Sequence, residues 1–171
     1  MNTHEFTLVI DHALDDDEQD ALYDVGCDDT TPEIEAGRTL LHFTREAASQ
    51  TAAVASAVLD VEKAGSPVGG VGSNDLVDVP EIASRVGRSR ESVRLLAAGR
   101  RGPGSFPTGR DGFYSWAAVR AWFADYDSDA VGAPDADALA YDRVIAAADH
   151  VVRARALMQG HAQGLRELLP T

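Results

Sequence analysis

Cysteine is almost absent from this chain of 171 residues, because Cys27 is its only example. One cysteine permits neither an internal disulfide nor a zinc site built on cysteine ligands, so a buried structural thiol is expected. The five histidines lack the spacing of metal ligands. The acidic run at residues 15–18 lacks the alternating ligands of a calcium loop and fits the start of a helix instead. No metal or other cofactor is therefore expected.

Long apolar runs are missing too. The longest candidate, residues 47–61, is interrupted by polar side chains and falls short of the roughly 18 apolar residues of a membrane helix. The N-terminus has no basic region and no apolar run of signal-peptide length. Phosphate-binding loops, dinucleotide fingerprints and nucleophile elbows are also absent. These absences predict a cytoplasmic protein that is not an enzyme and has no membrane partner.

Basic charge is scarce overall, with 15 Lys and Arg against 28 Asp and Glu, but it is unevenly distributed. Residues 1–74 hold 15 acidic and 3 basic residues, a net charge of −12, whereas residues 75–125 hold 6 acidic and 8 basic, a net +2. Residues 126–171 hold 7 acidic and 4 basic residues, a net −3. Residues 85–110 contain seven arginines and a single acid, Glu91. This asymmetry is expected of a modular protein with one part that faces a polyanion.

The acidic segment, residues 1–74, predicts the β-α-β-β-α-β order of a ferredoxin-like module. Strands are expected at residues 5–10, 30–35, 39–43 and 67–71, and helices at residues 15–25 and 47–64. A helical spacing predicts that the second helix buries Ala48, Thr51, Ala52, Ala55, Val58, Leu59 and Glu62. Gly72 to Asn74 would then form the domain boundary.

Residues 78–99, DVPEIASRVGRSRESVRLLAAG, predict two short helices joined by a tight turn. Asp78 and Ser89 are suitable N-caps, and Gly87 suits the turn. A small shared core is expected from Ile82, Ala83, Val86, Val93, Leu95 and Leu96. This spacing is typical of a helix-turn-helix, whose second helix enters the DNA major groove.

The next segment predicts a two-stranded wing, with one strand near Phe106, a turn at residues 109–112 and a strand at residues 113–115. A helix is expected at residues 116–124. The aromatic residues are expected to fill the core of this small domain: Phe106, Phe113, Trp116, Trp122 and Phe123. After the winged domain, residues 75–125, a polar linker is expected at 126–137 and a long helix at 138–171, with a possible break near Gly160 or Gly164.

Residues 76–123 resemble the winged helix-turn-helix of the MerR and excisionase (AlpA-like) superfamily. The resemblance rests on the two-helix segment, the wing entry GPGSFP, the strand FYSW and the closing helix WAAVRAWF. The matching residues are Val79, Glu81, Ile82, Ala83, Gly87, Ser89, Val93, Arg94, Leu95, Phe106, Pro107, Trp116, Val119 and Trp122. The chain departs from the superfamily because the motif lies mid-chain, behind an acidic module. The resemblance implies DNA binding and favours a dimer.

The fold class expected from these elements is α+β, and the expected function is sequence-specific binding of double-stranded DNA by a bacterial transcriptional regulator near the nucleoid. The candidate DNA-binding residues are Arg88, Ser89, Arg90, Glu91, Ser92, Arg94, Arg100, Arg101 and Arg110. Arginine can bind guanine O6 and N7 with two hydrogen bonds, and glutamate can accept one from cytosine N4. Arginines beside the wing would contact phosphates or the minor groove. The symmetry of most operators favours a homodimer, for which the C-terminal helix is a candidate.

An alternative is a protein-interaction adaptor. The acidic module would then bind and neutralise a basic protein partner, as in an antitoxin-like or phage and excisionase-type accessory protein. The DNA-binding part would serve autoregulation or DNA architecture.

Overall fold

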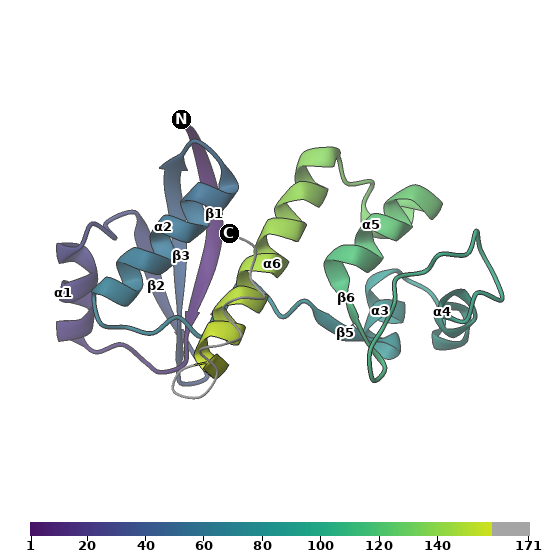
Figure 1. The fold of residues 1–171 in the computed structure, drawn as a ribbon, viewed down its shortest axis with the longest axis horizontal. Coiled ribbons are helices and arrows are strands. Elements are labelled where there is room, and N and C mark those ends of the chain that lie inside the picture. Colours follow the sequence, from purple (N-terminus) through teal and green to yellow (C-terminus); the bar gives the residue numbers. More distant parts are fainter. Residues whose placement is uncertain (159–171) are drawn as a thin grey trace. The chain divides into compact units, whose positions relative to one another are not determined.

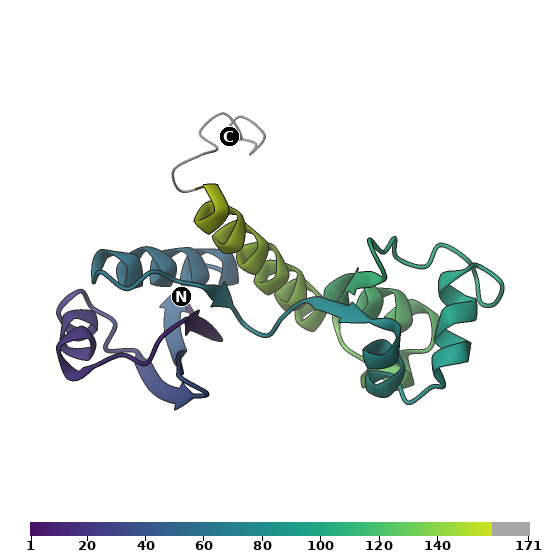
Figure 2. The same cartoon turned by 90° about the horizontal axis from the view of Figure 1, so that it is seen from below.

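A computed structural model describes residues 1–158 and shows a mixed α+β chain with an N-terminal antiparallel sheet and a C-terminal helix (Figures 1 and 2). The chain divides into two compact units. The first contains Met1–Ser73 and the chain from Ala147 onward, and the second is Asn74–Ala146. Within residues 1–158, no helix combines the length and apolar character needed to cross a bilayer.

The sheet of the first unit has four strands: β1 (Asn2–Ile10), β2 (Thr30–Glu35), β3 (Arg38–Ala47) and β4 (Gly70–Val71). Their spatial order is β2-β3-β1-β4, and every neighbouring pair is antiparallel. Alternate residues of β1 and β3 are buried on one face, where the Phe6 and Phe43 rings stack with centroids 5.3 Å apart. Two helices, α1 (Asp16–Asp24) and α2 (Gln50–Lys63), complete this unit's core through Leu22 and Val61, among others.

The acidic run at residues 15–18 is a helix start, as expected. The Asp15 carboxylate accepts a hydrogen bond from the Glu18 backbone N–H (2.9 Å), and the Glu18 carboxylate accepts one from the Asp15 N–H (3.0 Å). This reciprocal capping box satisfies two N–H groups that a helix end would otherwise leave unpaired. His12 adds a 2.9 Å contact to Glu18, and these hydrogen bonds hold the pKa of Glu18 below its usual value.

The predicted buried face of α2 is wrong. The buried residues are Ala53, Val54, Ala57, Val58 and Val61, so only Val58 was expected among them. Leu59, expected to face inward, is 62% exposed. Alanine occurs on almost every face of this helix, so the spacing does not single out one stripe. The helix also begins later than expected, at Gln50, because β3 continues to Ala47 and Ser49 then caps the helix.

A two-residue strand, β4, forms one edge of the sheet, and the last helix, α6 (Ala136–Met158), completes its hydrogen bonding. The buried Asp149 carboxylate of α6 accepts a hydrogen bond from the Val71 N–H at 2.9 Å. Arg153, one turn later, donates to the same carboxylate at 2.8 Å. A strand edge that would otherwise be open to pairing with another chain is thereby blocked at this point.

A buried arginine joins three segments of the first unit. Arg45 of β3 donates to both oxygens of Asp29, at 2.7 and 3.0 Å, and to Asp60 of α2 at 2.8 Å. Its guanidinium also lies 5.0 Å from the centre of the Phe43 ring. Burial opposes the charge, but the hydrogen bonds to the two carboxylates outweigh it and raise the pKa of Arg45 above its ordinary value. No motif in the sequence predicts this network.

The second unit contains β5 (Leu76–Asp78), α3 (Val79–Arg85), α4 (Arg90–Ala97), β6 (Phe113–Ser115), α5 (Trp116–Tyr126) and a 3₁₀ turn, η1 (Ser128–Val131). The expected strand near Phe106 is wrong, because β6 pairs with β5, the segment directly before α3. Residue 106 lies in a loop, where its ring packs on Tyr114, Trp122 and Phe123 instead of joining a sheet.

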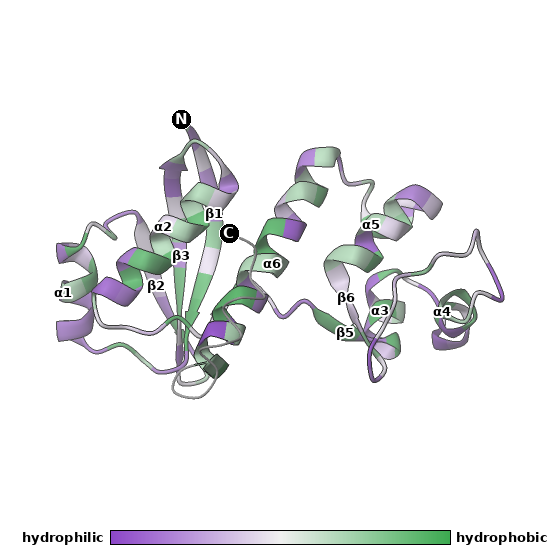
Figure 3. Ribbon diagram, in the orientation of Figure 1, coloured by the Kyte–Doolittle hydropathy of each residue, from purple (hydrophilic) through white to green (hydrophobic). Residues whose placement is uncertain are grey.

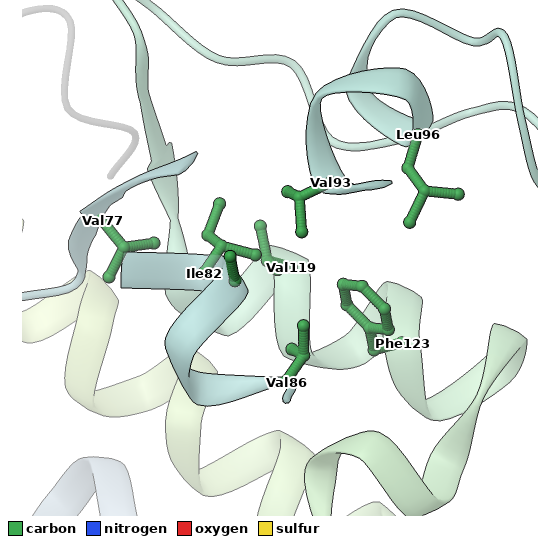
Figure 4. Close-up of a cluster of buried hydrophobic side chains, with 8 residues drawn as sticks. Val77, Ile82, Val86, Val93, Leu96, Val119 and Phe123 are labelled. Carbon is green, nitrogen blue, oxygen red and sulfur yellow. The ribbon is translucent and has the colours of Figure 1, made fainter. Parts of the chain in front are cut away.

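The core of the second unit is built by β5 and the helices α3, α4 and α5. Its buried residues are Val77, Ile82, Ala83, Val86, Val93, Leu96, Val119 and Phe123, most of which are labelled in Figure 4. Leu95 was expected to be in this core but is only half-buried, and Phe113 is 50% exposed. Phe106, Trp116 and Trp122 pack against the cluster from its margin.

The segment expected to be a linker is partly helical. It contains η1, and α6 begins at Ala136, two residues before the expected start at residue 138. The possible break at Gly160 or Gly164 lies outside the described residues.

Candidate nucleic-acid interface

The two helices α3 and α4 begin where short-range hydrogen bonds place them. The Asp78 carboxylate accepts from the Glu81 N–H at 2.8 Å, and the Ser89 hydroxyl oxygen accepts from the Ser92 N–H at 3.1 Å. Between them, Gly87 adopts a left-handed conformation with φ of +63°, which a glycine accepts without strain. Ser89 therefore acts first as a helix cap, and its hydroxyl keeps one O–H donor and one acceptor lone pair.

One side of α4 is buried and the opposite side is charged. Val93 and Leu96 have 0% and 1% exposure and point into the core in Figure 4. Arg90, Glu91 and Arg94 are exposed, and Figure 3 shows that hydrophilic and hydrophobic residues share this short helix. A helix anchored by one face in this way leaves its charged face exposed to solvent.

Glu91 and Arg94 form a two-pronged ion pair on that charged face. Arg94 Nε donates to Glu91 Oε2 and Arg94 Nη2 donates to Glu91 Oε1, each at 2.8 Å. These hydrogen bonds lower the pKa of Glu91, and the nearby charges of Arg100 and Arg101 add to the effect. The same pair raises the pKa of Arg94. Glu91 thus lies among three arginines.

Arg100 and Arg101 are held at the C-terminal end of α4. Gly99 adopts φ of +66°, and the N–H groups of Arg100 and Arg101 both donate to the Leu95 carbonyl, at 2.8 and 3.2 Å. Both residues are exposed. In the part of the chain that the structure describes, no carboxylate forms an ion pair with Arg90, Arg100 or Arg101.

Two arginines of the 85–110 segment form ion pairs with carboxylates of the second unit. Arg88 is half-buried, pairs with Asp127 and lies over the rings of Phe123 and Tyr126, at 5.8 and 5.4 Å. The hydrogen bond to Asp127 raises the pKa of Arg88. Arg85 pairs with Glu81 and lies 4.8 Å from the Trp116 ring. Both acids lie outside residues 85–110, so the segment's charge overstates the free positive charge, and Arg88 leaves the candidate set.

The loop between α4 and β6 is fastened to the core. Trp122 Nε1 donates to the Gly104 carbonyl at 3.1 Å, and the Phe106 ring lies 5.0 Å from that of Trp122. A Cβ atom on Gly102 would lie 2.8 Å from Leu96 Cδ2. The loop therefore takes a defined path beside α4.

A tight hairpin turn presents the last candidate arginine. Arg110 and Phe113 exchange two backbone hydrogen bonds, of 2.8 and 2.9 Å. Asp111 and Gly112 between them have φ of +53° and +86°, as the two-residue turns favoured in hairpins require. The Arg110 side chain is 96% exposed and only loosely paired with Asp111 at 3.8 Å. It is free to meet a phosphate.

Two glycines allow a paired test of how the loop is held. Gly87→Ala and Gly102→Ala both place a side chain at positive φ, but a Cβ has open space at residue 87 and a 2.8 Å contact with Leu96 at residue 102. We expect Gly87→Ala to cost about 1 kcal/mol of unfolding free energy from backbone strain alone. Gly102→Ala should cost clearly more, measured by urea unfolding followed through tryptophan fluorescence. Equal losses would contradict the tight packing of residue 102.

Comparisons with protein-family models, curated proteins and solved structures gave no match. Among residues 1–158, no group of three or more His, Cys, Asp or Glu side chains is placed to hold a metal ion.

Proposed function

We propose that the chain binds double-stranded DNA sequence-specifically and acts as a bacterial transcriptional regulator, with α4 in the major groove. The observation that carries this proposal is that α4 has one buried apolar side and one exposed charged side. Val93 and Leu96 anchor it in the core, while Arg90, Glu91 and Arg94 face outward. Helices that read base edges are held in this way.

The finer fold assignments are part of the proposal. The second unit is taken as a winged helix-turn-helix of the MerR and excisionase type, with α3 and α4 as its two helices. The first unit is taken as a ferredoxin-like module. The order of its elements and the antiparallel arrangement β2-β3-β1-β4 support that assignment.

The arginines divide into two chemical roles. Arg90 and Arg94 lie four residues apart, about 6 Å along the helix axis, so they would reach base pairs roughly two steps apart. Arg100, Arg101 and Arg110 would contact phosphates, which add affinity without sequence preference. The acidic first unit would limit non-specific binding by repelling the duplex.

This division of roles predicts different losses. Arg90→Ala should weaken binding to a selected duplex by about 1–3 kcal/mol and relax preference at one base pair. Arg100→Ala should weaken binding to all sequences alike and lower the slope of log affinity against log salt by about 1. Fluorescence anisotropy with labelled duplexes measures both.

Arg38→Ala is the matched control, because it removes an exposed arginine from the first unit, outside α6. We expect it to leave both the affinity and the base preference almost unchanged. An equal loss for Arg90→Ala and Arg38→Ala would count against recognition by α4.

We further propose that the protein binds as a homodimer on a symmetric site. Light scattering of the free protein, and the symmetry of a selected site, test this.

The charge of the first unit favours a second candidate, an adaptor that binds a basic protein. Residues 1–74 carry a net −12, and five of the six residues of β2, at the sheet edge, are exposed. Purification of the full chain with the products of adjacent genes tests this candidate. A stoichiometric basic partner would support it.

A further inference from the structure

We propose that Glu91 is a positioning residue, which holds the Arg94 guanidinium so that its outer edge reads a guanine, and that Glu91 does not itself read a base. The inference rests on the proposed function, since it assigns the specificity of the same helix. It also replaces the expectation that Glu91 accepts a hydrogen bond from cytosine.

The geometry of the pair leaves the reading edge of Arg94 free. A guanidinium has five N–H donors, and Glu91 takes one from Nε and one from Nη2. The remaining edge, between Nη1 and Nη2, carries two parallel N–H groups. These match the spacing of guanine O6 and N7. Within residues 1–158, no acceptor occupies Nη1 of Arg94.

The Glu91 carboxylate, in contrast, is directed at Arg94. Each of its oxygens accepts a hydrogen bond from Arg94, and Arg100 and Arg101 lie near enough to stabilise its charge. Each oxygen keeps a second lone pair, but the charge of the carboxylate is already neutralised by Arg94. A further hydrogen bond from the neutral N4 donor of cytosine would therefore add less than the bonds to the guanidinium.

The fixed pair also explains how an exposed arginine can discriminate. Unpaired arginines on a surface reach any phosphate, because their side chains turn freely. Arg94 is restrained on one edge, and the adjacent negative charge of Glu91 disfavours a phosphate there. Glu91 therefore lowers binding to arbitrary DNA and directs Arg94 to a base edge.

The test uses the full chain and a duplex selected from random DNA, with each base pair of the site substituted in turn. We expect Arg94→Ala to remove the preference for guanine at one base pair by roughly tenfold or more. Glu91→Ala should reduce the preference at that same base pair and strengthen binding to unrelated DNA several-fold. The double variant should discriminate no worse than Arg94→Ala, since the two residues act as one unit.

Glu81→Ala is the matched control, because it removes one acid from a comparable exposed ion pair, with Arg85 on α3. It should leave the base preference unchanged. A loss of preference in Glu91→Ala at a different base pair, or no loss, would overturn the inference while leaving the proposed function intact. If the wild-type chain selects no sequence at all, the proposed function and the inference both fail.

Discussion

Replacement of Arg45 by alanine is expected to lower the unfolding free energy of the first unit by about 3 kcal/mol. The side chain is 8% exposed and neutralises two carboxylates, Asp29 and Asp60, so its removal leaves two acids facing one another beside a void. Breaking a buried ion pair from one side costs about 3–5 kcal/mol. The partial exposure of these two carboxylates, 25% and 36%, lets water relieve part of the loss and favours the lower end of that range.

The single cysteine supplies the measurement for this variant. Cys27 is 3% exposed, and burial raises the pKa of its thiol, so it should react with a thiol reagent only when the first unit opens. The urea concentration at which labelling begins should fall in Arg45→Ala. Arg155→Ala, which breaks an exposed ion pair with Glu62, should change it little. Equal shifts in the two variants would show that the Arg45 network is not a major source of stability.

Replacement of Phe123 by alanine is expected to destabilise the second unit by about 3–5 kcal/mol and to disrupt the surface that we propose binds DNA. Phe123 is fully buried, and its ring meets those of Phe106, Trp122 and Tyr126 edge-on or tilted. Its loss removes a large apolar side chain and leaves a cavity next to the residues that anchor α4. The folding stability of the second unit and the proposed DNA binding should therefore be lost together.

Tryptophan fluorescence follows this second prediction, because both tryptophans, Trp116 and Trp122, lie in the second unit. The urea midpoint should fall strongly in Phe123→Ala and much less in Tyr126→Ala. Tyr126 belongs to the same ring cluster but is 37% exposed. A similar fall for both would mean that burial of Phe123 is not what holds the cluster together.

The features that the sequence predicted well are those set by residues a few positions apart. The helix start at the acidic run 15–18, the caps Asp78 and Ser89, and the glycine turn at residue 87 each depend on hydrogen bonds or dihedral angles within a single turn of chain. Such interactions can be inferred from local spacing alone.

The features that could not be predicted from the sequence depend on partners far apart in the chain. Arg88 was expected to face DNA, but Asp127, 39 residues later, holds it. Arg45 meets Asp60, 15 residues away, in a network that no motif indicates. Strand β6 pairs with β5, across two helices, and the ring of Phe106 packs in the aromatic cluster instead of joining a sheet. Spacing within one segment does not reveal which distant segment it meets.

The candidate site could be predicted from the sequence only in part. Exposure of Arg90, Glu91 and Arg94 follows from helical periodicity once Val93 and Leu96 are assigned to the core. The pairing of Glu91 with Arg94 is also local, at a separation of three residues, and was open to inference from the sequence. The two side chains were instead predicted to read bases separately.

Selection of bound sequences from random double-stranded DNA by the full chain tests the central claim most directly. We expect one enriched sequence that contains guanines, and we expect the enrichment to be lost when Arg90 and Arg94 are both replaced by alanine. A symmetric sequence would also support the homodimer. Recovery of no preferred sequence by the wild-type protein at low salt, or of the same sequence by the double variant, would contradict recognition of DNA by α4.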